Sequence, residues 1–281
     1  MRISVCGGDE RSVILARRLA EAGHEVLCFC LDKAELPDGC RGVGFPVEAD
    51  AVILPVPAED AHGLLNAPKG AQPCCIEHIL DCAGSGAVLI GGRISAQIRS
   101  AAEQRGMAVH DYMRCPELTV KNAAVTAEGA VSELMKKTKT ALCDMRVLVV
   151  GWGRIGKLLI SKLSALCPAV CLMSKNSEAR ALASALGCTA LAPDCPPEVL
   201  GGFDAVINTA PAQVIPDLRA FKDNCILLEL ASAPGGIDEN TAHKLGLDLS
   251  VLRGLPGHYA PESAAKAMFS AVSDILKGVI S

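Results

Sequence analysis

The feature that most constrains the fold of this chain is an apolar run at 147–150 that leads directly into Gly151, Gly153 and Gly156. The residues after these glycines keep the apolar spacing of a helix. In such a G-x-G-x-x-G turn the first glycine permits the tight bend and the second lets the backbone come close to a pyrophosphate. The third lets helix and strand pack together, and the helix N-terminus attracts anions. The pattern predicts a strand, turn and helix that bind a dinucleotide; the alternative is a glycine turn without a ligand.

The end of the next predicted strand, at 169–173, indicates which dinucleotide fits. NAD-binding domains place a carboxylate there for the ribose 2′-hydroxyl, whereas this chain has Ser174, Lys175, Asn176 and Ser177. Hydroxyl groups and a cation favour a 2′-phosphate and predict NADP; alternatively, Lys175 is only a solvated loop cation. The predicted cofactor-binding residues are Gly151, Trp152, Gly153, Arg154, Ile155, Gly156, Ser174, Lys175, Asn176, Asn208, Thr209, Ala210 and Pro211. For Asn208 and Thr209 the alternative is a turn that satisfies its own backbone.

Strand and helix patterns alternate along both halves of the chain, which predicts an α/β fold with two doubly wound parallel-sheet domains, the second a Rossmann dinucleotide-binding domain. The first half lacks the full glycine turn, and Asp9 at its own turn would oppose a phosphate. We therefore expect that half to bind substrate. The predicted strands are 3–5, 25–30, 51–54, 87–90, 108–110, 147–150, 169–173, 188–191, 205–209, 225–229 and 247–251.

Four segments are predicted from these patterns. A flavodoxin-like or Rossmann-like substrate domain spans 1–126, and an interdomain helix spans 127–144. The NADP-binding Rossmann domain spans 145–257, and a C-terminal helix at 258–281 is expected to pack back on the first domain.

Composition excludes several classes of function. The net charge is −4 and there are only eight aromatic residues in 281, so the chain offers no basic or stacking surface for nucleic acid. No apolar run is long enough for a membrane span, and the first strand starts almost at once, which predicts neither anchor nor signal peptide. The fourteen cysteines form no C-x-x-C pair and fit reduced core positions, so we expect no metal site and a cytoplasmic protein.

The candidates for chemistry are few. Proton transfer needs an acid or base, and a dicarboxylate substrate needs cations and hydrogen-bond donors. His258 and Glu128 are the candidate catalytic residues, with His258 as proton acceptor. The candidate substrate-binding residues are Thr126, Arg114, Ser232 and Arg253. Several of these we expect around one cleft, but His258 can equally be structural, and Thr126 with Glu128 can be an ordinary N-cap and first-turn acid.

An ordered set of motifs resembles the family of the dipicolinate synthase A subunit, and the resemblance runs nearly end to end. The motifs lie at 7–11, 122–130, 151–156, 229–236 and 254–261, with Thr-Ala-Glu-Gly at 126–129 and Gly-Leu-Pro-Gly at 254–257 the most specific. The resemblance implies an NADP-dependent oxidoreductase of spore formation. Its substrate would be 4-hydroxytetrahydrodipicolinate or the dehydrated form, aromatised to dipicolinate, and its partner the flavoprotein-like B subunit of dipicolinate synthase.

Two positions depart from the family pattern: Val125 replaces a proline and His258 replaces a lysine. Because histidine side chains titrate near neutral pH, affinity should fall as pH rises if His258 contacts a substrate carboxylate. Two other functions stay open, namely another two-domain NAD(P) dehydrogenase of the 2-hydroxy acid or methylenetetrahydrofolate type, and a non-catalytic NADP-binding subunit. The oligomeric state is also open, with a homo-oligomer among the options.

Overall fold

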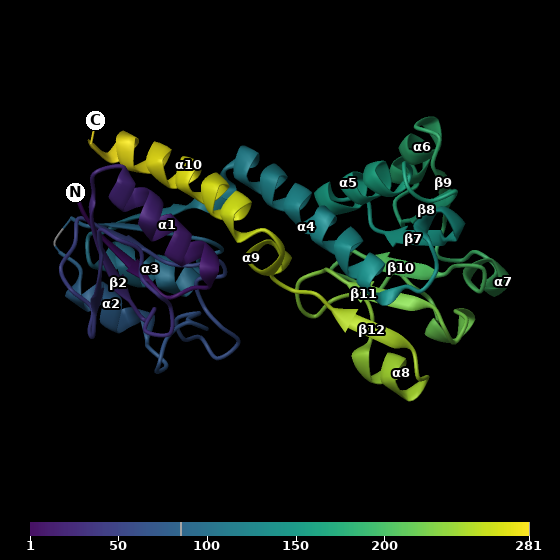
Figure 1. Cartoon of the computed structure of the whole chain (residues 1–281), viewed down its shortest axis with the longest axis horizontal. Coiled ribbons are helices and arrows are strands. Elements are labelled where there is room, and N and C mark those ends of the chain that lie inside the picture. The colour runs from purple at the N-terminus through teal and green to yellow at the C-terminus, as the bar shows by residue number, and fades with distance from the viewer. Residues whose placement is uncertain (85, 281) are drawn as a thin grey trace. The chain divides into compact units, whose positions relative to one another are not determined.

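The computed structural model describes residues 1–84 and 86–280 and divides into two compact units. Unit 1 comprises Met1–Asn122 and Pro256–Ser281, and unit 2 comprises Ala123–Leu255. Unit 1 therefore contains both ends of the chain, which lie near one another in it (Figure 1). Each unit is an α/β domain built on one six-stranded, all-parallel sheet, as the sequence predicts.

The sheet of unit 1 has the strand order β3-β2-β1-β4-β5-β6. Helices join β1 to β2, β4 to β5 and β5 to β6, whereas a loop at 30–39 joins β2 to β3. Strand order reverses between β1 and β4, and at such a switch point the carboxyl ends of parallel strands commonly bind ligands. The elements are β1 Arg2–Cys6, α1 Glu10–Glu21, β2 Glu25–Phe29, β3 Cys40–Val43, β4 Ala51–Ile53, α2 Ile76–Cys82, β5 Val88–Gly91, α3 Ala96–Gln104, β6 Ala108–Asp111, the 3-10 turn η1 Tyr112–Arg114, α9 Leu255–Tyr259 and α10 Pro261–Ile280.

The sheet of unit 2 repeats this topology in the order β12-β11-β10-β7-β8-β9, with the reversal between β7 and β10. The long helix α4, Pro116–Lys137, begins in unit 1 and continues into unit 2. The other elements are η2 Leu142–Asp144, β7 Arg146–Val150, α5 Arg154–Leu163, β8 Ala169–Met173, α6 Ser177–Ala185, β9 Thr189–Leu191, α7 Pro197–Leu200, β10 Ala205–Asn208, η3 Leu218–Ala220, β11 Ile226–Glu229, α8 Glu239–Lys244 and β12 Asp248–Val251.

The central strands are apolar throughout because both faces of each sheet are covered. In β7, Val147 and Val149 face one core with α4 and α5, while Leu148 and Val150 face a second core on the other side. All four of these side chains are fully buried. The continuous apolar run at 147–150 is thus explained by two-sided burial.

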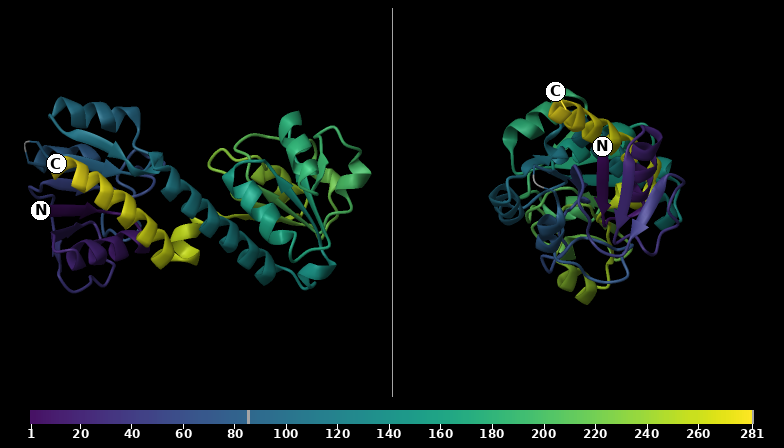
Figure 2. Two further views of the ribbon diagram at one scale, coloured as in Figure 1. Left: turned by 90° about the horizontal axis from the view of Figure 1, so that it is seen from above. Right: turned by 90° about the vertical axis from the view of Figure 1, so that its left-hand side faces the viewer.

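Helix α10 packs against α1 on unit 1 and runs along this unit in both views of Figure 2. Its apolar positions join the core beneath α1. Glu262 at its start is ion-paired with Arg17 at 2.6 Å and with Arg18 at 3.1 Å. These contacts place residues 261–280 in the first unit, although they are the last part of the chain.

Two features of the fold differ from the sequence prediction. Strand β3 was not predicted, because Cys40-Arg-Gly-Val43 is a half-exposed edge strand without an apolar pattern. The helix expected from residue 127 begins instead at Pro116, a residue with a preference for the first helical position.

Across the described residues no helix is long and apolar enough to cross a membrane. All fourteen cysteines are free thiols, and no group of His, Cys, Asp and Glu within 1–84 and 86–280 could hold a metal ion.

Candidate functional site

The glycine turn lies at the switch point of the second sheet, between β7 and α5. Gly151 has φ +101°, a conformation that favours glycine, and its N–H donates to the Met173 carbonyl at 2.9 Å. Thr209, after the neighbouring strand β10, donates its hydroxyl to the Val150 carbonyl at 2.8 Å. The two loops that border the switch point are therefore tied to each other.

The three glycines have different physical roles. A Cβ added at Gly156 would lie 2.0 Å from the Gly151 carbonyl oxygen, and one at Gly151 would lie 2.7 Å from Thr209 Oγ1. Both glycines are required by close packing within the protein. A Cβ at Gly153 would meet nothing within 4 Å, and its φ of −78° suits any residue. Packing within the chain thus does not require glycine at position 153. The open space there would let a ligand come close to the backbone.

Helix α5 starts at Arg154, and the N–H groups of its first turn have no acceptor within the helix. Arg154 is exposed, whereas Ile155 packs against the core. Trp152 is half-buried against the same core, with Lys157 Nζ 5.5 Å from its ring. Its Nε1 is buried and has no hydrogen-bond partner in the part of the chain described. The turn therefore presents backbone N–H groups to an anion, while the Trp152 side chain packs against the protein.

A second cation, which the sequence did not predict, reaches the loop after β8 from helix α6. Arg180 Nη1 donates to the carbonyls of Ser174 at 2.7 Å and Lys175 at 3.0 Å. The Asn176 side chain caps α6 by accepting from Ala179 N–H at 3.0 Å. Arg180 lies one helical turn after Asn176, and that spacing was the available signal. Exposed Lys175 and half-buried Arg180 make this loop positive.

Asn208 does not face solvent as a loop residue would. It is fully buried, and its amide donates to both carboxylate oxygens of Glu229, at 2.9 and 2.8 Å, and to the Ala210 carbonyl at 2.9 Å. Thr209 and Ala210 are half-buried, and Pro211 is exposed. Asn208 can thus affect a ligand only through the loop that it holds.

The expected N-cap at Thr126 and first-turn acid at Glu128 are wrong as helix-start assignments. Both residues lie well inside α4, where Thr126 is buried. The Glu128 carboxylate accepts from Lys162 Nζ of α5 at 2.9 Å and is half-exposed. This pair links α4 to the helix that follows the glycine turn.

Ser232 and Arg253 lie in loops at the carboxyl edge of the second sheet. Ser232 is exposed after β11, and its carbonyl accepts from Gly235 N–H at 2.9 Å. Arg253 is exposed after β12, with its Nη2 3.7 Å from Glu239 Oε1. Both side chains are accessible at the edge that carries the glycine turn.

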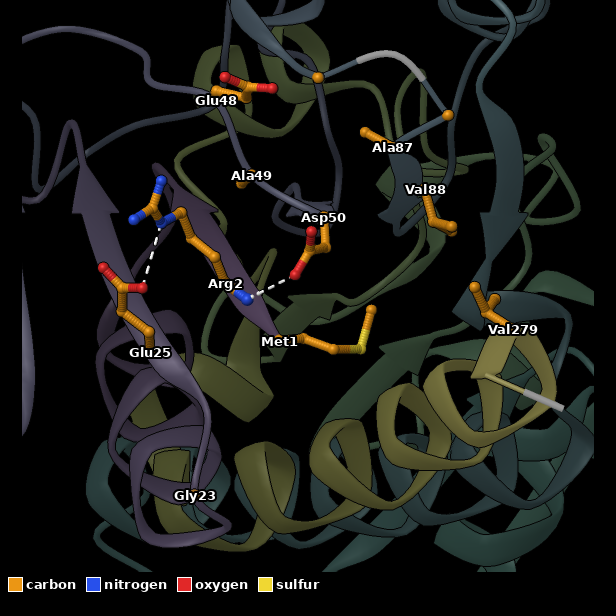
Figure 3. Close-up of a pocket in the computed structure, with 12 residues that line it drawn as sticks. Met1, Arg2, Gly23, Glu25, Glu48, Ala49, Asp50, Ala87, Val88 and Val279 are labelled. Atoms are coloured by element: carbon orange, nitrogen blue, oxygen red, sulfur yellow. Dashed lines mark hydrogen bonds and ion pairs between the residues drawn. The ribbon is translucent and has the colours of Figure 1, made fainter.

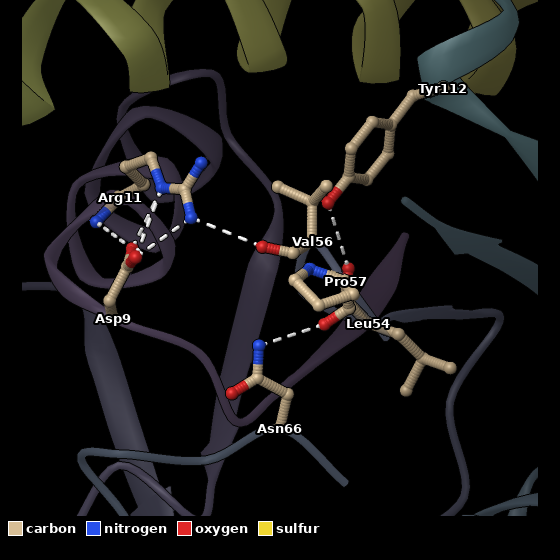
Figure 4. A network of polar contacts seen from close by, with 7 residues as sticks. All are labelled: Asp9, Arg11, Leu54, Val56, Pro57, Asn66 and Tyr112. Atoms are coloured by element: carbon tan, nitrogen blue, oxygen red, sulfur yellow. Dashed lines mark hydrogen bonds and ion pairs between the residues drawn. The ribbon is translucent and has the colours of Figure 1, made fainter. Parts of the chain in front are cut away.

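In unit 1 the carboxyl edge of the sheet carries a network centred on Arg11, a residue that is 7% exposed (Figure 4). Asp9 caps α1 and accepts from Arg11 Nε at 2.9 Å and Nη2 at 2.8 Å. Arg11 Nη2 also donates to the Val56 carbonyl at 3.1 Å. Helix α9 rests on this pair, because a Cβ at Gly257 would lie 2.4 Å from Asp9 Oδ2 and 3.0 Å from Arg11 Nε. The adjacent residue His258 is exposed and close enough to act electrostatically on Asp9.

The pKa of Asp9 is lowered. Burial raises it, but the hydrogen bonds and positive charge of Arg11 outweigh burial, and His258 adds to the lowering. Asp9 is thus an ionised part of the support of α9.

Arg114 lies in η1 and precedes α4 by two residues, not the expected helix start at Thr126. It lines a hollow of about 460 Å³ beside the edge strand β6, together with Arg99 and His110. Arg99 Nη1 is engaged with the Val109 carbonyl at 3.1 Å.

Another hollow of unit 1, of about 880 Å³, lies at the amino edge of its sheet (Figure 3). Three of its lining residues are acidic, and Arg2 is bonded to two of them, through its backbone N–H to Asp50 at 2.7 Å and through its side chain to Glu25 at 3.1 Å. Because parallel sheets bind ligands at the carboxyl edge, this hollow does not compete with the switch point as a functional site.

Comparisons with known proteins agree with the motifs. Residues 2–113 match the family model described as the N-terminal domain of the dipicolinate synthase A subunit. The A subunit of dipicolinate synthase from Bacillus subtilis strain 168 is 26% identical over 98% of this chain and 96% of its own length. This chain is similar to the dipicolinate synthase A subunit along nearly its whole length. The resemblance inferred from the motifs is confirmed.

Solved structures agree at the level of the fold. The dipicolinate synthase A subunit of Bacillus halodurans superposes with a TM-score of 0.84 at 23% identity, over 98% of this chain and 97% of that one. A transhydrogenase of Sinorhizobium meliloti superposes with a TM-score of 0.69 at 16% identity, over 99% of this chain and 94% of that one. The two-sheet α/β architecture is thus shared by these proteins.

Proposed function

We propose that this chain is an NADP-dependent oxidoreductase that forms dipicolinate from 4-hydroxytetrahydrodipicolinate or dihydrodipicolinate in spore formation. The observation that carries the proposal is the glycine turn of unit 2, in a chain related along 98% of its length to the dipicolinate synthase A subunit. Dipicolinate is proposed as the product because that relative is named as a subunit of dipicolinate synthase.

The residues of unit 2 fit a dinucleotide. Gly153 leaves open space at the second glycine of the turn, and the first turn of α5 offers unbonded N–H groups. Gly151, Gly153 and Gly156 would hold the pyrophosphate, with Arg154 beside it. When bound, the nicotinamide would supply the hydride acceptor.

A 2′-phosphate is favoured by the loop after β8. Lys175 and Arg180 bring two positive charges there, and exposed Ser177 supplies a hydroxyl group, whereas buried Ser174 shapes the loop by accepting from Asn176 N–H at 3.2 Å. No carboxylate follows β8 directly where a ribose diol would need one. These features support NADP over NAD.

For the substrate, the chain offers cations and proton-transfer groups in both units. His258 is proposed as proton acceptor and Glu128 as a second catalytic residue, with Thr126, Arg114, Ser232 and Arg253 as substrate-binding residues. Arg114 and His258 belong to unit 1, and the other four to unit 2. Because Glu128 is ion-paired with Lys162, its role requires that this pair opens or that it acts through Lys162.

The relative is named as one subunit of an enzyme, so we propose the flavoprotein-like B subunit of dipicolinate synthase as partner and the cytoplasm as location. Nucleic acid and membrane lipids are not proposed as partners.

A binding experiment tests the cofactor. Trp152, the only tryptophan, adjoins the phosphate loop, so its fluorescence should change with NADP and far less with NAD. Lys175→Gln and Arg180→Gln should each weaken NADP binding about tenfold, which corresponds to about 1.4 kcal/mol, and leave NAD binding unchanged. Tighter binding of NAD than of NADP by the natural chain would contradict the assignment.

A turnover experiment tests the reaction. The purified chain is mixed with freshly made 4-hydroxytetrahydrodipicolinate and NADP, with and without the B subunit. Equal formation of NADPH and dipicolinate by this chain on its own is the expected result. Formation only with the B subunit present would move part of the chemistry to the partner, and NADP binding without turnover under either condition would favour a non-catalytic role.

A further inference from the structure

Glu229 is a buried carboxylate that the proposed reaction does not use. It is the last residue of β11 and is 1% exposed. No cation pairs with it among the described residues, so its charge must be balanced by hydrogen bonds. A buried carboxylate is costly unless its lone pairs are satisfied.

Its two oxygens accept from N–H groups at both ends of one loop. Oε1 accepts from Ala231 N–H at 2.8 Å. Oε2 accepts from Gly236 N–H at 2.8 Å and Ile237 N–H at 2.9 Å. The Asn208 amide donates to both oxygens. The carboxylate therefore holds both ends of the loop at 231–237 and joins them to the end of β10.

Asn208 carries the same connection into the preceding loop. Its amide nitrogen donates to the Ala210 carbonyl at 2.9 Å, and its carbonyl oxygen accepts from Ala210 N–H at 3.2 Å. Gly236 closes the contact, because a Cβ there would lie 2.7 Å from the Ala212 carbonyl oxygen and 2.7 Å from Asn208 Nδ2. The loops at 210–212 and 231–237 are thus held together by one pair of buried side chains.

We infer that Glu229, with Asn208, is a positioning residue that fixes the two loops bordering the nicotinamide half of the cofactor. The inference rests on the proposed function. In a Rossmann domain the adenosine half extends over the strands on one side of the switch point and the nicotinamide half over those on the other. Here Lys175 and Arg180 follow β8 on the first side, while β10 and β11 lie on the second.

Glu229→Gln tests this inference because it keeps the shape and replaces one acceptor oxygen by a donor. At least one N–H of the loop then faces another N–H group. We expect the Kd of NADP to rise at least tenfold. The Kd of adenosine 2′,5′-bisphosphate, which carries only the adenosine side, should stay within twofold.

Asp204→Asn is the matched control, since Asp204 is a half-buried carboxylate bonded to Arg146 N–H and Lys222 at the amino edge of the same sheet. It should leave both dissociation constants unchanged. Gly236→Ala is a second variant that separates the loops without altering the carboxylate, and it should reproduce the selective loss. Gly278→Ala is its control, because a Cβ there would meet nothing within 4 Å.

Amide hydrogen exchange gives a readout that needs no nucleotide. Glu229→Gln should speed exchange at least tenfold at Ala231, Gly236 and Ile237, and leave Gly151 unchanged. Equal weakening of both ligands, or unchanged exchange in that loop, would overturn the inference. If the natural chain bound neither ligand, the proposed function would fail, and exchange would still decide whether Glu229 holds the loops.

Discussion

Alanine at Gly153 should weaken NADP binding and alanine at Gly156 should lower stability, because the first glycine leaves space for a ligand and the second is required by packing. At Gly153 the added methyl meets nothing within 4 Å and the backbone conformation suits alanine. Reduced freedom of the unfolded chain should contribute about 0.4–1 kcal/mol to stability. Loss of glycine at a helix N-cap costs a similar amount, up to about 1 kcal/mol. The stability of Gly153→Ala should thus remain within about 1 kcal/mol of the natural chain.

At Gly156 the added methyl would lie 2.0 Å from the Gly151 carbonyl oxygen, where ordinary contact begins at 3.4 Å. The helix or the turn must therefore withdraw by about 1.4 Å, the difference between the two distances. Overpacking of this kind typically costs about 1–3 kcal/mol, and we expect the upper end because the methyl group meets a backbone carbonyl rather than a flexible side chain.

The assay is urea unfolding followed by Trp152 fluorescence, which reports on unit 2 alone because the chain has no other tryptophan. Two units need not unfold together, so circular dichroism is recorded in parallel. NADP titration completes the pair: Gly153→Ala should bind at least tenfold more weakly, a loss of about 1.4 kcal/mol, despite its normal stability. Unaltered NADP affinity of Gly153→Ala, or unaltered stability of Gly156→Ala, would refute the assignment of the two roles.

Three further predictions concern other parts of the chain. Gly257→Ala should push α9 away from Asp9 and Arg11 and shift the NMR signals of the His258 ring. The control Gly278→Ala should leave these signals unchanged. Identical His258 signals in Gly257→Ala and the natural chain would contradict the support of α9 by Asp9 and Arg11. Since the pKa of Asp9 is lowered in the folded state, its contribution to stability is present above the unfolded value of about 3.9 and lost as pH falls through the folded value. The free energy of unfolding of unit 1 should therefore fall less between neutral and acidic pH in Asp9→Asn than in the natural chain. The same pH dependence in the variant and the natural chain would count against this. Under brief alkylation at neutral pH, mass spectrometry should find label on the exposed thiols of Cys75 and Cys143. Cys6 and Cys225 should carry no label, because burial raises the pKa of both thiols to about 12. Early labelling of Cys6 would show that the core of unit 1 opens readily.

The parts of the fold that the sequence predicted are those in which local pattern and tertiary burial agree. The strand at 147–150 and the glycine turn were visible because two-sided burial demands apolar residues and the turn demands glycine at 151 and 156. Strand β3 could not be predicted because it is a half-exposed edge strand, and its residues Arg41 and Gly42 show no apolar pattern.

The predicted site was less complete because its supporting residues act through distant contacts. Thr126 has the residue type of an N-cap, but only the chain from Pro116 onward reveals that it lies inside a helix. Glu229 is an acid at the end of a strand, a position at which acids are often exposed. Its burial depends on the loop that returns to it at 236–237, which the local sequence does not show. Arg180 lies in α6, but its side chain donates hydrogen bonds to carbonyls of the loop after β8.

The discontinuity of unit 1 has a consequence for the order in which a growing chain can fold. Residues 123–255 emerge from the ribosome before 256–281, so unit 2 can complete its core while the first unit still lacks α10. Until then Leu15 and Leu19 of α1 lack Met268 and Val272, which complete their apolar cluster. Such incomplete apolar surfaces aggregate and bind chaperones. A stop codon shortly after Gly257 should thus spare unit 2 and leave unit 1 without α10, so the folding of unit 1 depends on residues 261–280.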